Sequence, residues 1–176
     1  MHIVGLLDKP TRGNVYIQGK DISKIPDDKL SMLRNEFVGF VFQQFNLINK
    51  LTILENILLP TIYTRKILKY NPEEKAHYLM KRFGIEGKEN SYPNKISGGQ
   101  QQRVAIARAL IMEPNLILAD EPTGNLDTKS GTEILKLLKE LNKEEKITIV
   151  IVTHDKNVAD QTKRIIQIQD GEVIKK

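Results

Sequence analysis

The fold is decided by the stretch Leu116-Ile117-Leu118-Ala119-Asp120-Glu121-Pro122. Its four consecutive apolar residues predict a strand buried on both faces, as in a parallel sheet. Similar apolar runs recur at 37–42, 147–153 and 165–168, with helical patterns such as 97–111 between them. Strands that alternate with helices predict an α/β fold built around a parallel sheet.

One segment departs from this alternation. Between Gln44 and Asn94 the pattern is helical, no convincing strand occurs, and a fresh helix begins at Pro72. The apolar opening Met1–Leu7 has no helix-start signal, so we expect the chain to begin inside a helix. The expected organisation is one domain over 1–176, with an α/β core of 1–43 and 95–176 and a helical subdomain of 44–94.

Composition excludes several classes of protein. The 176 residues are 40% hydrophobic and 28% charged, which is typical of a globular domain. There is no cysteine, which excludes a disulfide framework, thiol catalysis and a zinc–cysteine site. The net charge of +5 is interleaved with acids and lacks a stacking-aromatic motif. We therefore expect a solvated surface and no nucleic-acid partner.

The two carboxylates Asp120 and Glu121 end the decisive strand. Ligands of open α/β sheets bind at this edge, and adjacent strand residues point to opposite faces. One acid can hold magnesium through its water shell, and the other can orient an attacking water. Taken alone, a polar strand end without a function explains the pair equally well.

A second pattern opens the helix that precedes this strand. Ser97 is a good N-cap, and Gln100 three residues later completes a capping box. Gly98 and Gly99 let a phosphate approach the backbone amides, where the helix dipole favours an anion. Two glycines alone also fit a plain helix start, but the full string Ile96–Arg103, reading ISGGQQQR, makes that alternative weak.

These strings resemble the ATP-binding cassette (ABC) ATPases along the whole chain. Ile96–Arg103 resembles the ABC signature, with isoleucine in place of the usual leucine. Ala119–Asp127, reading ADEPTGNLD, is similar to the Walker B acid, catalytic glutamate and D-loop. Val152–Asp155 resembles the switch-histidine motif, and Phe40–Gln44 resembles the Q-loop. The resemblance implies a P-loop NTPase-like, RecA-type parallel sheet with an inserted helical subdomain.

The resemblance also implies a role for each motif residue. Asp120 would support Mg²⁺, Glu121 would polarise the hydrolytic water, and His154 would contact the γ-phosphate of ATP. Gln43 would sense both the magnesium and the γ-phosphate. A second set would bind the ATP held by the opposite subunit of a head-to-tail dimer and tie the two sites together: Ser97, Gly98, Gly99, Gln100 and Asp127.

The strings FVFQQFNLI, LTILENILLP and EPTGNLD are similar to exporters that work with lipoprotein-releasing, macrolide or antimicrobial-peptide permeases. The resemblance implies an ATP-hydrolysing subunit whose Gln44–Pro60 region receives a membrane permease. It would lie in the cytoplasm, at the inner face of the cell membrane. The DNA-maintenance relatives are disfavoured, because they carry long coiled coils or large insertions in place of the short helical segment.

The phosphate-binding segment of that family, G-x-x-x-x-G-K-[ST], occurs nowhere in the 176 residues. The resemblance would place it just before Met1, so we expect an N-terminally truncated cassette that alone does not bind ATP usefully. The missing strand would lie between 147–153 and 165–168, leaving two apolar edges without partners. A misassigned start and a truncated gene stay open as origins. A catalytically inactive remnant, acting at most as an interaction partner, stays open as the competing function.

Overall fold

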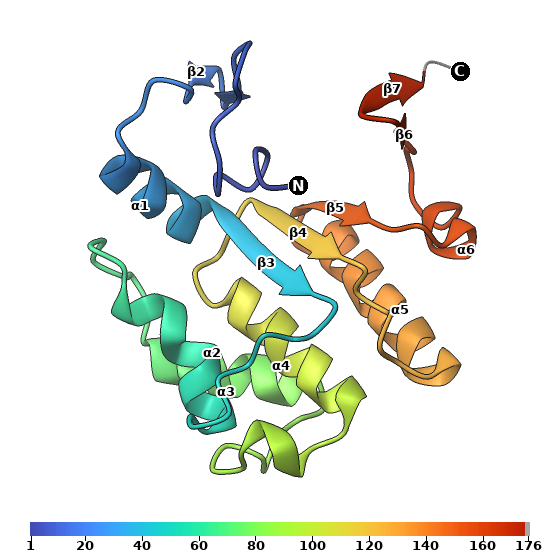
Figure 1. Cartoon of the computed structure of the whole chain (residues 1–176). Coiled ribbons are helices and arrows are strands. Elements are labelled where there is room, and N and C mark those ends of the chain that lie inside the picture. Colours follow the sequence, from blue (N-terminus) through green and yellow to red (C-terminus); the bar gives the residue numbers. More distant parts are fainter. Residues whose placement is uncertain (175–176) are drawn as a thin grey trace.

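A computed structural model describes residues 1–174, and a three-stranded parallel sheet forms its centre (Figure 1). The strand order is β3 (Val38–Phe42), β4 (Leu116–Asp120) and β5 (Thr148–Val152). Each pair is in parallel register, so that Val38 lies opposite Leu116 and Leu116 lies opposite Thr148. The predicted α/β class with a parallel sheet is therefore confirmed.

One face of this sheet is covered by helices. Side chains at alternate positions, including Val41, Ile117 and Ala119, share a hydrophobic core with α4 (Gly98–Leu110) and α5 (Thr128–Glu144). Helices α2 (Ile53–Ile62) and α3 (Pro72–Arg82) extend the same core outside α4 (Figure 1). The division into a core and a helical subdomain stays a prediction, because these helices and the sheet share one apolar cluster.

Helix α4 approaches β3 unusually closely. A Cβ atom at Gly39 would lie 2.4 Å from the backbone oxygen of Ala109, well inside van der Waals contact. Only glycine therefore permits this separation between the helix and the strand. The close approach fixes the helix that begins at Ser97 against the strand that leads to Gln43.

The opposite face is covered over β3 and β4 only. The N-terminal segment, with the buried Leu6, packs there together with α1 (Asp27–Phe37) and the hairpin of β1 (Tyr16–Ile17) and β2 (Lys20–Asp21). The predicted helix at the start of the chain is wrong. Residues 1–7 form hydrogen-bonded turns in which Leu6 has a φ of 60°, a left-handed conformation that a helix cannot continue through.

Strand β5 is less buried than its composition predicts. Val150 and Val152 are 39% and 41% exposed, because the N-terminal segment does not reach this end of the sheet. Within residues 1–174, β5 pairs with β4 alone, and β6 (Gln167–Gln169) pairs only with β7 (Glu172–Ile174). The two apolar edges without partners stay a prediction, and the strand that was expected at 165–168 begins later, at Gln167, where it pairs with β7.

Most helix boundaries follow the capping chemistry in the sequence. Thr52 and Glu55 form a capping box at the start of α2, and Asn71 caps α3 just before Pro72. The two remaining short elements are η1 (Pro93–Lys95) and α6 (Lys156–Ala159). None of the helices described within residues 1–174 has the length and apolar character required to cross a membrane.

Candidate functional site

The carboxyl ends of the three strands bring the predicted catalytic residues to one edge. Phe42, Asp120 and Val152 lie side by side in the register of the sheet. Gln43 and Glu121 each follow directly after the first two, and His154 follows two residues after the third. Residues that are far apart in the sequence therefore meet at the edge where α/β sheets bind ligands.

Glu121 is held by the neighbouring strand through both its backbone and its side chain. Its φ of 43° is left-handed, and its N–H donates to the carbonyl of Val152 at 2.9 Å. The carboxylate accepts hydrogen bonds from the Thr153 hydroxyl at 2.9 Å and from the His154 amide at 2.7 Å. The Nδ1 atom of His154 lies 2.8 Å from the same carboxylate. The acid is thus fixed in one orientation.

The hydrogen bonds to Glu121 also decide its charge. Burial by itself would raise the pKa of this carboxyl, but the bonds from the His154 amide, the Thr153 hydroxyl and the His154 ring outweigh burial. Its pKa therefore lies below the ordinary glutamate value of 4.5, and the group is ionised at neutral pH. An ionised carboxylate accepts the Nδ1–H of the histidine, which assigns that tautomer. The ring itself is open to solvent, with the side chain 88% exposed.

Gln43 is joined to the loop that follows Glu121. The Gln43 Nε2 atom donates to Oδ1 of Asn125 at 3.3 Å, and Nδ2 of Asn125 donates to the Gln43 carbonyl at 3.0 Å. Gly124 makes room for this pair, because an added Cβ there would lie 2.6 Å from Nε2 of Gln43. Asn125 was not among the predicted site residues, although it lies inside the ADEPTGNLD string that carried the prediction.

The oxygen atoms at this edge fit a magnesium ion. No hydrogen bond described within residues 1–174 uses the Asp120 carboxylate or Oε1 of Gln43, so both retain free acceptor oxygens. Mg²⁺ is usually bound by one or two carboxylates together with waters and substrate phosphates, rather than by a complete protein cage. Among the described residues, no group of three or more His, Cys, Asp or Glu side chains could by itself hold a metal.

The second predicted set of residues lies at the start of α4. The capping box is confirmed, because Ser97 Oγ accepts from the Gln100 amide at 3.3 Å and Gln100 Oε1 accepts from the Ser97 amide at 3.0 Å. A Cβ at Gly99 would lie 3.1 Å from Oγ of Ser130. That hydroxyl donates to the carboxylate of Asp127, which caps α5. Ser97–Gln100 and Asp127 therefore form a neighbouring group.

The two groups are not joined directly. Within residues 1–174, no described hydrogen bond links Ser97–Gln100 to Gln43, Asp120, Glu121 or His154. The first group faces the carboxyl edge of the sheet, and the second lies where α4 and α5 begin. The second group is nevertheless close to the loops of the first, because a Cβ at Gly98 would lie 3.7 Å from the Phe45 ring and 3.9 Å from the Asn125 backbone oxygen.

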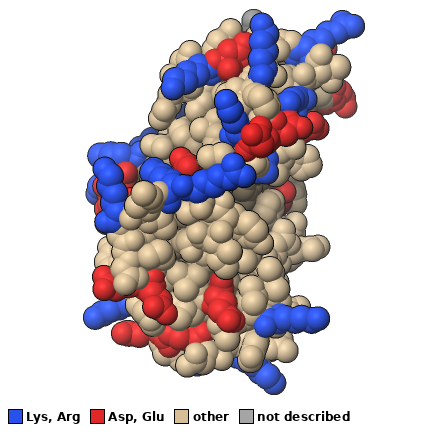
Figure 2. Space-filling view, turned by 90° about the vertical axis from the view of Figure 1, so that its left-hand side faces the viewer, with Lys and Arg blue, Asp and Glu red and all other residues tan. Residues whose placement is uncertain are grey.

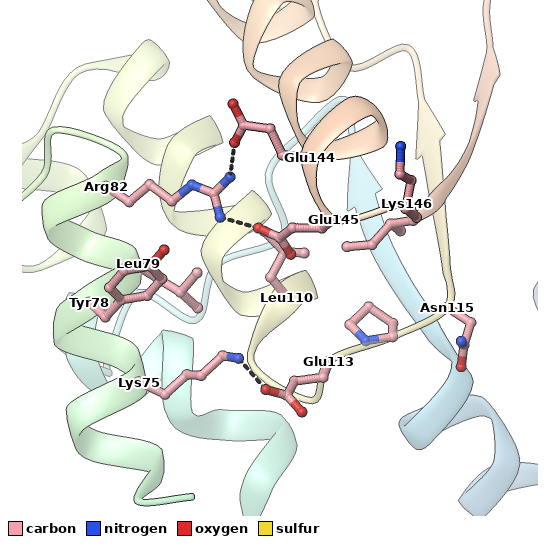
Figure 3. A pocket seen from close by; sticks show the side chains of 12 residues that line it. Lys75, Tyr78, Leu79, Arg82, Leu110, Glu113, Asn115, Glu144, Glu145 and Lys146 are labelled. Carbon is pink, nitrogen blue, oxygen red and sulfur yellow. Dashed lines mark hydrogen bonds and ion pairs between the residues drawn. The ribbon is translucent and has the colours of Figure 1, made fainter.

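Two cavities of similar size lie outside these groups. One, of about 650 Å³, is lined by residues of α1, β3 and α2, including Phe42, Leu59 and Pro60. The other, of about 640 Å³, lies at the amino ends of β4 and β5 and contains none of the predicted site residues (Figure 3).

The face seen in Figure 2 is largely uncharged across its middle, with charged side chains above and below.

Comparison with known proteins identifies the family to which these motifs belong. Residues 1–124 match the family model described as ABC transporter. The chain belongs to the ABC transporter family. It is 51% identical over 176 residues to the ABC transporter ATP-binding protein MJ0796 of Methanocaldococcus jannaschii, covering 98% of this chain and 75% of that protein.

A second group of ABC transporter relatives is considerably longer. The chain is 48% identical to the macrolide export ATP-binding/permease protein MacB of Mannheimia succiniciproducens, with 99% of this chain aligned. It spans only 27% of the length of that relative. Macrolide-exporter proteins are thus among the homologues of this ATP-binding domain.

Solved structures agree with the family assignment. A dimeric post-hydrolysis structure of MJ0796 bound to ADP and Pi matches with a TM-score of 0.87 and 49% identity, over 99% of this chain and 76% of that one. The cbiO1 protein of Clostridium perfringens matches with a TM-score of 0.85 and 31% identity, over 98% and 68%. The fold is that of the ABC ATPase cassettes, a P-loop NTPase fold, as the motifs predicted.

Proposed function

We propose that the chain is the ATP-binding and ATP-hydrolysing subunit of an ABC transporter that powers a membrane permease in export or lipoprotein release. The observation that carries this proposal is Glu121, an ionised carboxylate fixed beside Asp120 at the carboxyl edge of the sheet. A general base must be deprotonated and held in reach of the water that it activates. The hydrogen bonds from Thr153 and His154 keep the carboxylate ionised and fix its orientation.

Each residue at this edge takes a role that fits its free atoms. Asp120 and Gln43 would hold Mg²⁺ through their oxygens, Glu121 would polarise the hydrolytic water, and His154 would contact the γ-phosphate from its exposed ring. A magnesium ion held there would supply positive charge against the phosphate oxygens. The protein's own part is to orient the water and to keep the base ionised.

The start of α4 supports a head-to-tail dimer. Ser97–Gln100 present a capped, glycine-rich helix start, which is suited to a phosphate, and Ser97 is exposed at the surface of its own chain. We propose that Ser97, Gly98, Gly99 and Gln100 bind ATP held by the opposite subunit, and that Asp127 ties the two sites together. The dimeric state named for the MJ0796 structures supports this arrangement.

The permease is proposed to bind at the Gln44–Pro60 region. Asn46, Leu59 and Pro60 of this region line the cavity of about 650 Å³ beside β3, and the MacB relatives are named as combined ATP-binding and permease proteins. In this proposal the chain is peripheral on the cytoplasmic face of the membrane through its permease.

Hydrolysis assays test the catalytic proposal. MgATP turnover by the chain with its permease should fall at least about 100-fold in Glu121→Gln, the minimum expected for loss of a general base. Turnover that is equal in the variant would refute the role of Glu121. Absence of turnover in the unchanged chain would favour the competing function, an inactive interaction partner.

A mixed assay tests the dimer separately, because the 176 residues contain no phosphate-binding segment. The intact MJ0796 cassette is given a disabled signature serine and mixed with this chain. Restored ATP turnover is expected, since Ser97–Gln100 would complete the site on the intact subunit. Ser97→Arg should abolish the restoration and Asn94→Arg, at another exposed position, should not.

A DNA-binding titration tests the remaining alternative. Binding that weakens as the salt concentration rises would favour an ABC ATPase of nucleic-acid maintenance.

A further inference from the structure

Helix α4 carries an arginine that holds the loop after Gln43. Arg108 donates from Nη1 to the carbonyl of Asn46 at 2.5 Å and from Nη2 to the carbonyl of Phe45 at 2.8 Å. Burial lowers the pKa of this guanidinium, although arginine remains charged at any physiological pH. A charged, bidentate donor therefore fixes two consecutive peptide groups of this loop.

The same helix carries a glutamine that holds the turn after Glu121. Gln102 is fully buried, and its Nε2 donates to the carbonyl of Pro122 at 2.7 Å. Its Oε1 atom has no hydrogen-bond partner among the described residues. A buried amide that keeps one atom unpaired is costly, so stability alone does not account for a glutamine at this position.

The two loops are also joined to each other. The reciprocal bonds of Gln43 and Asn125 link them directly, while Arg108 and Gln102 link each of them to α4. The contacts thus form a closed ring, which runs from the helix to one loop, across to the other loop and back to the helix.

The loops need such support because their backbones are strained. Phe45 and Asn46 have φ angles of 61° and 50°, and Glu121 has a φ of 43°. Left-handed conformations of residues other than glycine persist only where surrounding contacts hold them in place. The bonds from α4 end at or next to these three residues.

We infer that Arg108 and Gln102 are positioning residues, through which α4 fixes the Gln43 loop relative to the Glu121 turn. Neither side chain is assigned to touch ATP or the reacting atoms. A displacement of the loop at Phe45–Asn46 is therefore passed to residues 121–126 by two routes, through Asn125 and through α4. The catalytic meaning of this link rests on the proposed function, but the link itself does not.

Amide hydrogen exchange, followed by NMR on the full chain, tests the link without ATP. In Arg108→Met we expect the amides of Phe45 and Asn46 to exchange at least about tenfold faster, because each residue loses one charged hydrogen bond to its carbonyl. The amides of Gly124 and Leu126, which bond within the 121–126 turn, should also exchange faster, although the described hydrogen bonds of Arg108 end at Phe45 and Asn46.

The matched control is Arg103→Met on the same helix. Arg103 likewise makes two bonds, to the Phe83 carbonyl at 3.0 Å and to Glu133 at 2.7 Å, but neither bond reaches the loops. This variant should leave exchange at Gly124 and Leu126 unchanged. Equal acceleration at those amides in both variants would overturn the inference, because it would show general loosening of the fold.

Two further variants keep the test decisive if Arg108→Met does not fold. Arg108→Lys keeps the charge with a single donor nitrogen and should give an intermediate acceleration. Gln102→Met removes the bond to Pro122 together with the unpaired Oε1, so exchange at Gly124 should rise while the denaturation midpoint changes little. Unchanged exchange at Gly124 in both variants would overturn the inference, and ATP turnover has no bearing on either result.

Discussion

The two ends of the central sheet are held together in different ways. At the carboxyl end, hydrogen bonds from side chains and from the backbone fix Gln43 and Glu121. At the amino end, α3 and the end of α5 line a pocket (Figure 3). Ion pairs cross this pocket: Arg82 pairs with Glu144 and Glu145, and Lys75 pairs with Glu113.

The hydrogen bonds at the carboxyl end orient individual side chains, whereas the ion pairs at the amino end hold one helix against another. A hydrogen bond weakens steeply with angle, so it defines an orientation. Partly exposed ion pairs contribute little and are screened by salt. We therefore expect substitutions at the carboxyl end to cost more than comparable substitutions at the amino end, and the predictions below follow in that order.

The largest effect is expected at Asn56 in α2, whose fully buried side chain holds the segment that leads on from the carboxyl end of β3. Its Nδ2 donates to the carbonyls of Ile48, Leu51 and Thr52, and its Oδ1 accepts from the Ile48 amide at 2.8 Å. Asn56→Leu leaves several of these backbone groups without a hydrogen-bond partner. Each such buried group costs about 1–3 kcal/mol of folding free energy. Urea denaturation should show the free energy of unfolding reduced by about 3 kcal/mol.

The matched comparison at the amino end is Asn142→Leu. Asn142 is only partly buried; it donates to the Ile147 carbonyl at 2.8 Å and accepts from Nζ of the exposed Lys163 at 2.9 Å. Water can replace both partners, so the loss should be about 1 kcal/mol, less than for buried groups left unpaired. Equal losses in the two asparagine variants would remove the distinction between the two ends.

A smaller effect is expected from the ion pairs in the pocket. The Arg82 side chain is 22% exposed, and its partners Glu144 and Glu145 are 61% and 36% exposed. Arg82→Met should therefore reduce the free energy of unfolding by about 1 kcal/mol or less. The loss should largely disappear in 1 M salt, where the screening length is about 3 Å.

Lys81→Met serves as the control for the pocket. Lys81 is the neighbouring exposed cation and makes no ion pair within residues 1–174. Denaturation of this variant should match the unchanged chain at both salt concentrations. A loss for Arg82→Met that persists in 1 M salt would show that packing, rather than charge, fastens α3 to α5.

The smallest effect concerns pH and the cap of α5. Hydrogen bonds from the Ser130 side chain and amide lower the pKa of Asp127 below its ordinary value of 3.8. A lowered pKa gives stability above the unfolded value, and this contribution is lost as the pH falls through the folded value. Asp127→Asn should therefore have a lower melting temperature at pH 6, with the gap narrowing below about pH 4.

Ser130→Ala removes the partner of that carboxylate and should show the same dependence on pH. Thermal unfolding followed by circular dichroism between pH 6 and pH 3 checks both variants. A gap that widens toward pH 3 would contradict the assigned direction of the pKa shift.

The sequence predicts the regular elements well because their signals are local. Thr52 with Glu55, and Ser97 with Gln100, announce the starts of α2 and α4 within four residues. The failures depend on tertiary contacts. Leu6 takes a left-handed backbone as it packs against β3 and β4, and Val150 stays exposed because nothing described covers that end of the sheet.

The candidate site likewise contains residues that local sequence predicts and residues that only tertiary contacts bring together. Asp120 and Glu121 are visible as the acidic end of an apolar strand, so their edge of the sheet could be predicted. The pairing of Gln43 with Asn125 and the bonds of Arg108 to Phe45 and Asn46 join residues that are far apart in the chain. No local pattern announces them, since an arginine in a helix is ordinarily a surface residue.

The order of the strands in the sheet has a consequence for the synthesis of the protein. Strand β3 pairs only with β4 within the described chain, and β4 begins at Leu116, far downstream of Phe42. At 5–20 residues per second, β3 therefore leaves the ribosome about 4–15 s before its partner. Helices α2 and α3 emerge in that interval and carry Ile53 and Met80, which share a core with Val41. We expect these helices to shield β3 in the nascent chain until β4 arrives.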